Sequence, residues 1–243
     1  MRALIAVLAC IMVGPSWAAE AIVTDGDTLM LNGAVFRLDG IDAPQTDQTC
    51  LDESGAVWRC GIEARDRLKQ YIGKRDVRCD DRKADINFAK RRIGICWIEA
   101  ETVNLNQWLV REGWAMNLEP SAKGRFKADQ DNARDSRKGL WKGCFVSPLT
   151  LRRWTRSSAK LLGAACPSGN IWLARGILFP DRPAMPSGCS IKGKFTVRSR
   201  ITSHRGIYHA ESCRSYARTI MPDRWFCSED EARAEGFRKS YTC

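Results

Sequence analysis

The sequence predicts an α+β protein, mainly β: a five-stranded OB-fold barrel with about three helices, followed by a small cysteine-rich C-terminal module. Five short apolar runs, separated by turn signals, lie between residues 21 and 98. Three stretches with a helical spacing of apolar residues lie between or after these runs. Short strands around a compact core with interposed helices are typical of an OB-like barrel.

The individual elements follow from local patterns. Asp25-Gly26-Asp27 forms a turn between the first two strands, and Asn32-Gly33 is a strong signal for a two-residue hairpin. Gly73 and Gly113 each close a helical stretch. In chain order we expect strands at 21–23, 28–31 and 35–38, a helix at 61–72, strands at 76–79 and 92–98, and helices at 103–112 and 126–138.

The first residues read as a leader. Arg2 precedes an apolar run that is too short to span a bilayer, and small residues follow up to Ala18. This pattern predicts a secretory signal peptide at 1–18. The alternative is a lipoprotein box that ends at Cys10, with the mature protein acylated there. No later segment is apolar enough to cross a membrane. We therefore expect a secreted or periplasmic monomer with no stable membrane insertion.

The cysteines and the charge fit an exported protein that meets a polyanion. The chain has 11 cysteines, and an even number remains once Cys10 leaves with the leader, which favours disulfides. The formal net charge of +11 suits a nucleic-acid partner. Generic solubility, or attraction to an anionic envelope surface, would explain the same charge.

Proline and glycine divide the rest of the chain. The linker contains Pro167-Ser168-Gly169 and ends at Pro186-Ser187-Gly188. We expect a barrel domain at 21–145, a basic linker at 146–187 and a cysteine-rich module at 188–243.

Acidic and arginine residues gather at the turns of the barrel domain. Asp25 and Asp27 share a tight turn. Arg37 ends a strand ahead of Asp42 in a proline-bounded loop, and Arg91 precedes another strand. Singly, an Asp-Gly turn is ordinary hairpin chemistry and a strand arginine is usually solvated. Together, a hard cation held by carboxylates and two guanidinium groups can neutralise a phosphodiester and stabilise its transition state.

The order of these motifs resembles the thermonuclease family, whose prototype is staphylococcal nuclease. The similarity covers roughly Ala21 to Cys144 and implies an OB-fold nuclease that uses Ca2+ to cleave DNA and RNA. The segments that carry it are Asp25-Gly26-Asp27-Thr28, Phe36-Arg37-Leu38, Gly40-Ile41-Asp42-Ala43-Pro44, Arg91, Leu109-Val110-Arg111-Glu112-Gly113-Trp114-Ala115 and Gly139-Leu140-Trp141.

The resemblance also implies a calcium site. By position, Asp27 and Asp42 match the family's calcium carboxylates, and the carbonyl of Ala43 matches its backbone ligand. Asp25 stands where the family has a nearby supporting acid.

The resemblance further implies the catalytic residues Arg37, Gln45 and Arg91, with one departure. Arg37 and Arg91 match the two arginines on the phosphate, although Ala89-Lys90 replaces the family's usual Tyr-Gly. Where the family has a glutamate proposed as general base, this chain has Gln45. An amide cannot take up a proton near neutral pH, but its oxygen can orient water. Asp47 is an alternative acid if its loop can reach the site.

Other hydrolase chemistries fit poorly. The only histidines, His204 and His209, lie in the C-terminal module, so a histidine-based nuclease site in the barrel lacks its base. The sequence contains neither a Gly-x-Ser-x-Gly elbow nor a P-loop.

The C-terminal module resembles the small nuclease-associated sunset module over about Gly188 to Ser240, although Lys194 replaces its common asparagine. The matching residues are Cys189-Ser190-Ile191-Lys192-Gly193, Ile207-Tyr208-His209, Tyr216, Thr219, Arg224-Trp225-Phe226-Cys227-Ser228-Glu229, Glu231-Ala232 and Gly236-Phe237-Arg238.

The module's cysteines and basic residues allow two interpretations each. Four cysteines could form two disulfides, which export favours, or bind zinc together with His209; they are Cys189, Cys213, Cys227 and Cys243. The basic residues could form a nucleic-acid platform or a solvated face on an aromatic core. This second set comprises Lys192, Lys194, Arg198, Arg200 and Arg205 among Phe195, Tyr208 and Trp225. In the barrel, Cys79 could pair with Cys96, and Cys50 with Cys60.

The leading functional prediction is an exported Ca2+-dependent phosphodiesterase of the endonuclease type, with DNA or RNA as substrate. The alternative is a catalytically degenerate periplasmic protein that binds nucleic acid or another polyanion. Relatives in the family are linked to exopolysaccharide production, which makes such a role conceivable. Gln45 is the feature that favours this alternative.

Overall fold

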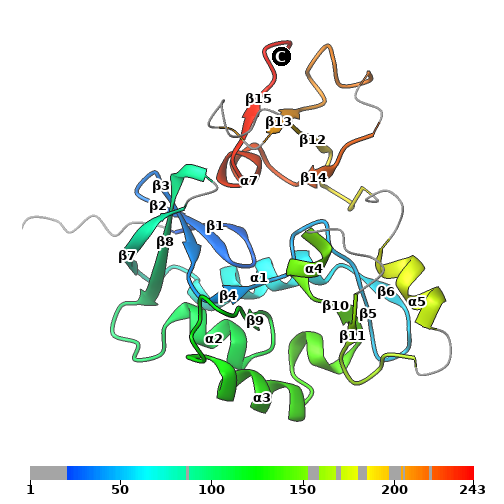
Figure 1. Ribbon diagram of the computed structural model, residues 1–243. Helices are drawn as coiled ribbons and strands as arrows, with labels where there is room; N and C mark the ends of the chain where they lie inside the picture. Colours follow the sequence, from blue (N-terminus) through cyan, green and yellow to red (C-terminus); the bar gives the residue numbers. More distant parts are fainter. Residues whose placement is uncertain are drawn as a thin grey trace, which may run out of the picture.

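The fold is that of a computed structural model, in which the C-terminal module lies above a larger α+β body (Figure 1). The predicted leader at 1–18 and the alternative acylation site at Cys10 lie outside the described residues. The structure describes residues 21–85, 88–152, 159–167, 171–179, 185–196, 204, 206–218 and 221–243.

A five-stranded sheet forms the larger body. Its strand order is β1-β2-β3-β8-β7, with β3 and β8 parallel and the other neighbours antiparallel. Asn32 and Gly33 have φ values of 51° and 77°, as a two-residue hairpin turn requires. The strands are β1 (Ile22–Asp25), β2 (Thr28–Leu31), β3 (Ala34–Leu38), β7 (Val77–Asp85) and β8 (Phe88–Ile98).

The prediction of a mixed, mainly β fold is confirmed, but the prediction of a closed barrel is wrong. The sheet is open, with β1 at one edge and β7 at the other. The edge strand β1 is four residues long, and helices α1 (Cys60–Ile72) and α7 (Glu229–Ala234) lie against it. Helices α1 and α7 therefore cover the edge of β1, where a closed barrel would need one more pairing between strands.

Three helices lie near the predicted positions, and Gly73 follows the last residue of α1. Helix α2 (Leu105–Arg111) starts two residues later than predicted, because the side chain of Asn104 accepts a hydrogen bond from the Gln107 backbone and caps it. Helix α3 (Lys127–Asp135) ends before Arg137, whose φ is 52°, and a short 3₁₀ helix η1 (Gly139–Lys142) follows.

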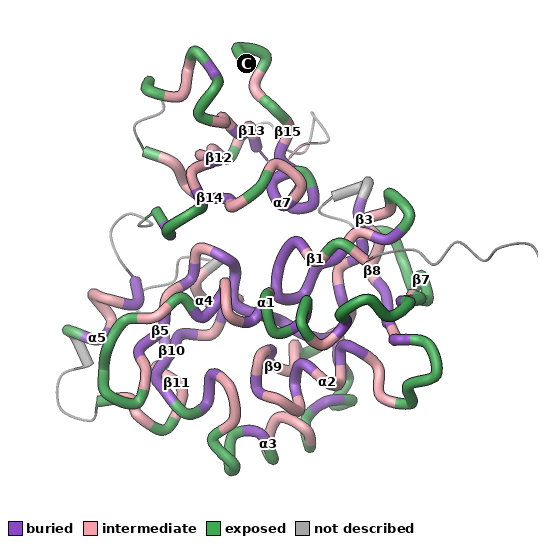
Figure 2. Tube along the Cα trace, turned by 180° about the vertical axis from the view of Figure 1, so that it is seen from behind, coloured by how far each residue is buried: buried purple, intermediate pink, exposed green. Residues whose placement is uncertain are grey.

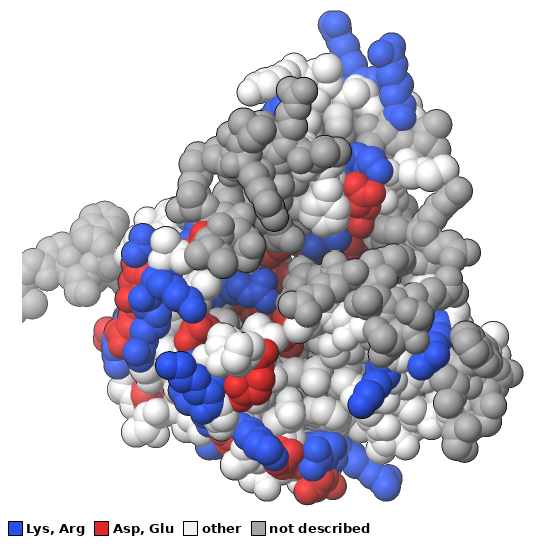
Figure 3. Space-filling view, viewed as in Figure 1, with Lys and Arg blue, Asp and Glu red and all other residues white. Residues whose placement is uncertain are grey.

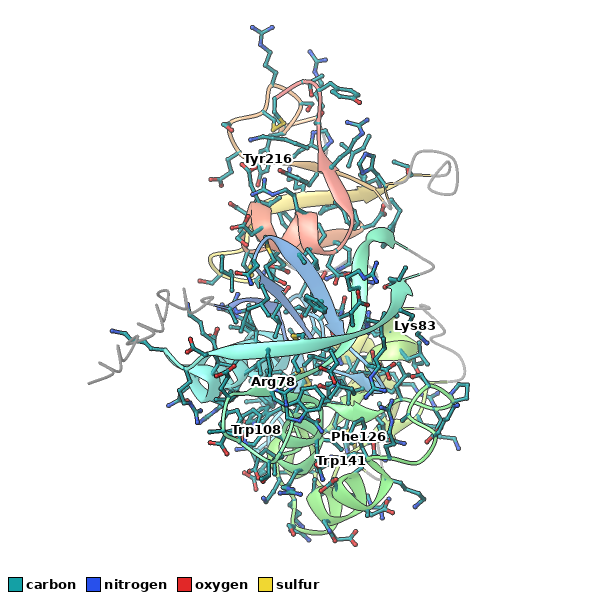
Figure 4. All side chains as sticks on the ribbon, turned by 90° about the vertical axis from the view of Figure 1, so that its left-hand side faces the viewer. Arg78, Lys83, Trp108, Phe126, Trp141 and Tyr216 are labelled. Carbon is teal, nitrogen blue, oxygen red and sulfur yellow. A yellow bond between two sulfur atoms is a disulfide. The ribbon has the colours of Figure 1, made fainter. Side chains whose placement is uncertain are left out.

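The main core lies between this sheet and helices α1 and α2. Its fully buried side chains include Leu29, Leu38, Leu68, Leu105 and Leu109. The aromatic residues Trp108, Phe126 and Trp141 lie at the helical end of the body, opposite Tyr216 of the C-terminal module (Figure 4). The sheet thus separates the main core from the face on which the module rests.

Short strand pairs complete the larger body. Strand β4 (Ile41–Asp42) pairs with β9 (Met116–Asn117), which fixes the loop that carries Asp42. Strands β5 (Cys50–Leu51) and β6 (Val57–Trp58) pair ahead of α1.

The segment predicted as a basic linker contains packed structure in its described parts. It holds α4 (Pro148–Arg152) and α5 (Ile171–Leu178), and β10 (Phe145–Val146) pairs with β11 (Leu161–Leu162). A second hydrophobic cluster, including Ala174, Leu178 and Phe179, joins this segment to the larger body. The cluster explains why these parts are ordered against the body.

The C-terminal module is a four-stranded sheet with one helix. The strand order is β14-β12-β13-β15, and α7 precedes the last strand. Its core consists of Ile191, Tyr208, Phe226, Ala232 and Phe237. The strands are β12 (Ile191–Phe195), β13 (Gly206–His209), β14 (Arg224–Phe226) and β15 (Phe237–Lys239).

Ten cysteines form five disulfides. The predicted pairs Cys50–Cys60 and Cys79–Cys96 are confirmed. In the C-terminal module Cys189 pairs with Cys227 and Cys213 with Cys243, so the disulfide interpretation holds and the zinc interpretation is wrong. The fifth pair, Cys144–Cys166, joins the body to the following segment.

Among the described helices, none combines the length and the apolar character needed to cross a membrane.

Gly61 sets the distance between α1 and the loop that carries Gln45. A Cβ atom at Gly61 would lie 1.7 Å from the Gln45 carbonyl oxygen, so α1 would have to move away from the loop. We expect Gly61→Ala to lower the free energy of unfolding by about 3 kcal/mol, measured by urea denaturation. The control is Gly176→Ala in α5, where the new Cβ would meet no atom within 4 Å. Similar losses in both variants would contradict this packing argument.

Candidate functional site

Two loops bring Asp27 and Asp42 to one place. The turn between β1 and β2 carries Asp27, and pairing of Thr28 with Arg37 sets this turn beside the end of β3. A Cβ at Gly26 would lie 2.8 Å from the Cβ of Ala43, so a glycine is needed where the two loops meet. The backbone N–H of Ala43 donates to Asp27 Oδ2 over 3.3 Å.

Arg37 binds both carboxylates. Its Nη2 lies 2.9 Å from Asp27 Oδ2 and 3.2 Å from Asp42 Oδ1. Burial by itself would lower the pKa of Arg37, but Asp27 and Asp42 hold the pKa above its usual value. The guanidinium is therefore charged at any pH the protein meets. The structure places the three predicted residues together on one side of the sheet.

Asp25 adds a third buried carboxyl group to this turn. Its Oδ1 accepts a hydrogen bond from the Gly26 backbone, whereas Oδ2 has no hydrogen-bond partner among the described residues. Burial and the neighbouring charge of Asp27 raise the pKa of Asp25 well above its usual value.

Arg91 lies on the same face of the sheet as Arg37. In the parallel pair β3 and β8, Val35 faces Arg91 and Arg37 faces Ile93, and side chains two residues apart share a face. Arg91 Nε lies 2.8 Å from Asp85 Oδ2, and Nη1 lies 3.0 Å from Glu235 Oε1. Arg91 is thus held between a strand residue and the C-terminal module.

Gln45 and Asp47 both meet Arg224 of the C-terminal module. Arg224 Nη1 donates to Gln45 Oε1 over 3.0 Å, and Arg224 Nε lies 2.8 Å from Asp47 Oδ2. Asp47, considered as a substitute acid, is therefore engaged by an arginine. The Gln45 Nε2 atom is buried and has no hydrogen-bond partner among the described residues.

Sequence reasoning missed the three charged residues that the C-terminal module adds to the site: Arg224, Glu231 and Glu235. Glu231 accepts hydrogen bonds from the Thr46 hydroxyl and from the Cys227 backbone. The contacts of Glu231 with Thr46, Glu235 with Arg91 and Arg224 with Gln45 each join residues more than 140 positions apart, so no local spacing signals them.

Two of the three aromatic residues of the predicted platform are buried, which favours the core interpretation for them, whereas Phe195 is 47% exposed. Tyr208 and Trp225 are buried, at 1% and 9% exposure, so their rings cannot receive a base. Lys192 lies over the ring of Tyr216, and Lys194 pairs with Asp223. The other three basic residues of the predicted platform, at positions 198, 200 and 205, lie outside the described residues.

The oxygen atoms at the turn are of the kind that Ca2+ prefers. Asp27, Asp42 and the Ala43 carbonyl are the candidate ligands named by the sequence. Nowhere in the described ranges do three or more histidine, cysteine or acidic side chains gather in an arrangement that could hold a metal ion.

Comparison with known proteins identifies part of the larger body. Residues 35–143 match the family described as staphylococcal nuclease homologue. The matched region begins after Asp25 and Asp27. The turn that carries these two residues is held against the matched region by the pairing of β2 with β3. Residues 35–143 therefore form a staphylococcal nuclease-like domain. The fold of this family is an OB-fold.

One curated relative is similar over the same region. It is the succinoglycan biosynthesis protein ExoI of Rhizobium meliloti (strain 1021), with 34% identity over 124 residues. The aligned region covers 51% of this chain and 63% of that protein.

Glu231 should make stability depend on pH. Burial raises its pKa to about 7, whereas an unfolded glutamate has a pKa near 4.5. The folded state therefore holds this proton more tightly, and the associated stability is present below pH 4.5 and lost as pH rises through 7. We expect Glu231→Gln to gain stability relative to the wild type by roughly 2 kcal/mol between pH 5 and pH 8. Urea unfolding at several pH values measures this difference, and a constant difference would contradict the prediction.

Proposed function

We propose that this chain, whose residues 35–143 form a staphylococcal nuclease-like domain, is an exported nuclease that hydrolyses phosphodiester bonds of DNA and RNA with Ca2+. The observation that carries the proposal is the contact of one guanidinium, that of Arg37, with carboxylates from two separate loops, Asp27 and Asp42. Such a group of charges fits a phosphodiester, which presents anionic oxygens to both a cation and a guanidinium.

The donor set supports Ca2+. Asp27, Asp42 and the carbonyl of Ala43 would hold the ion, with water in the remaining positions. The buried Asp25 Oδ2, which has no hydrogen-bond partner among the described residues, supports a cation nearby, since a buried acceptor of this kind is costly. Ca2+ bound there would offset the negative charge of the phosphate.

The arginines would hold the phosphate. A guanidinium presents forked N–H donors that match two phosphate oxygens, and it remains charged when buried. Arg37 and Arg91 share one face of the sheet, which supports binding of one phosphate by both.

Gln45 would position the attacking water without accepting its proton. General-base catalysis contributes roughly 10²–10⁴-fold to rates, so we expect slow turnover. In this structure the Gln45 oxygen accepts its hydrogen bond from Arg224.

Export is supported by the five disulfides, which form in oxidising compartments, together with the predicted leader at 1–18. We propose that the mature protein is a secreted or periplasmic monomer, and that its C-terminal region is a sunset-like accessory module.

Calcium dependence is tested with Asp42→Asn. The wild-type protein should cleave plasmid DNA and RNA in Ca2+ and stop in EGTA. Asp42→Asn should lose Ca2+ affinity and lower the cleavage rate by about 10²-fold or more, because a metal ligand and a partner of Arg37 are both removed. The control is Asp135→Asn, whose side chain is 72% exposed and whose ion-pair partner among the described residues is Arg134. Cleavage that persists in EGTA would contradict the proposal.

Gln45→Glu tests the altered general-base position. We expect the cleavage rate to rise by about 10²-fold, because a carboxylate at this position can accept the proton of water. The rate would be compared at saturating Ca2+ across pH 6 to 9, with the catalysed step becoming pH dependent in the variant alone. If the wild type never cleaves while the variant does, the protein is a degenerate member of the nuclease group.

The second candidate function is non-catalytic binding of a polyanion in the periplasm, with a role in exopolysaccharide production. Gln45 and the name of the similar succinoglycan biosynthesis protein favour it. Tight, salt-sensitive binding of oligonucleotides without cleavage by any variant would support this candidate over the nuclease.

A further inference from the structure

The C-terminal module rests directly on the candidate site. Helix α7 lies against β1 and β2, the strands that flank the Asp27 turn (Figure 1). Acidic and basic side chains are mixed where the module meets the larger body (Figure 3). The contacts join Arg224 with Gln45 and Asp47, and Glu231 with Thr46.

Glu235 pairs with Arg91, and its charge also influences two other arginines of the site, Arg37 and Arg224. It follows the last residue of α7, and its Oε1 lies 3.0 Å from Arg91 Nη1. Its charge also acts on Arg37 and Arg224, because it helps to raise the pKa of both guanidinium groups. One carboxylate thus stands among three arginines, as the phosphate of a substrate would.

A nucleic acid cannot reach the site in this arrangement. Arg91, Asp42 and Gln45 are each 2% exposed, and Asp27 is 0% exposed. The second half of β1, Thr24 and Asp25, is buried, as is the turn that follows it (Figure 2). A polymer continues on both sides of the phosphate that is cleaved, so its binding requires an open groove.

We propose that the C-terminal module is an intramolecular inhibitor, in which the Glu235 carboxylate takes the place of the substrate phosphate on Arg91, and that the module must withdraw before a nucleic acid binds. The proposal rests on the proposed function, since it takes the arginine cluster as a phosphate site.

Two features allow the module to withdraw. None of the five disulfides joins a residue before 167 to a residue after 188, so the module is not covalently stapled to the site. The closed interface also buries Gln45 Nε2 and Arg224 Nη2 without hydrogen-bond partners among the described residues. Burial removes each of these N–H donors from solvent, and no acceptor among the described residues replaces the water. The closed state is therefore less stable than an interface in which every donor is hydrogen-bonded.

The test compares Glu235→Gln with Asp230→Asn in the full chain. Both variants remove one negative charge from the region of α7, but Asp230 is paired with Arg233 on the exposed side. Binding of a fluorescently labelled single-stranded oligonucleotide is measured in EGTA, where Ca2+-dependent cleavage is off. We expect Glu235→Gln to bind at least about tenfold more tightly than the wild type, because the apparent affinity rises with the open fraction. Asp230→Asn should stay within about twofold of the wild type.

Hydrogen exchange gives a readout that needs no nucleic acid. Amides of β1, β2 and α7 should exchange faster in Glu235→Gln than in Asp230→Asn, because opening exposes both sides of the contact. Asp47→Asn, which removes the partner of Arg224, should produce the same change and serves if Glu235→Gln unfolds.

The outcomes separate this inference from the proposed function. Faster exchange and tighter binding without cleavage in Ca2+ would support the inhibitor and overturn the nuclease. Unchanged hydrogen exchange and unchanged oligonucleotide binding in Glu235→Gln would overturn the inhibitor. If cleavage were also unchanged, Glu235 would not block the site, and if cleavage were lost, Glu235 would belong to the working site.

Discussion

The ion pairs of Arg37 with Asp27 and Asp42 are the interaction on which the site depends. Two carboxylates buried this deeply would repel one another and destabilise both loops, unless a positive charge stood between them. The guanidinium supplies that charge from the end of β3, and it fixes the β1–β2 turn relative to the end of β4. Burial, together with the charge of Asp27, raises the pKa of the neighbouring Asp25.

Local patterns in the sequence predicted most of the larger body. The Asn32-Gly33 turn, the end of α1 at Gly73 and two disulfides were all predicted correctly. The prediction of a closed barrel was wrong because closure depends on what covers the edge strand β1. The helix α7, which helps to cover β1, comes from residues about 200 positions away in the sequence. Periodicity describes neighbours along the chain and carries no information about such a contact.

The candidate site divides in the same way. Asp27, Arg37 and Asp42 lie on adjacent strands and turns, so their order in the sequence already brings them close. Arg91 was predicted to precede a strand, whereas it lies within β8 beside β3, and its partner Glu235 could not be foreseen. Arg224 binds the amide oxygen of Gln45, so the position that departs from the family and the contact with the module are joined in one interaction.

The open sheet leaves β7 with an unpaired outer edge among the described residues. Free edges invite neighbouring molecules to add strands, which leads to aggregation. The outer part of β7 is exposed and carries charges of both signs on Arg78, Asp80, Asp81, Arg82 and Lys83 (Figure 4). A second copy approaching this edge would have to strip water from those charges. A protein with this edge can therefore be concentrated without polymerising through its largest sheet.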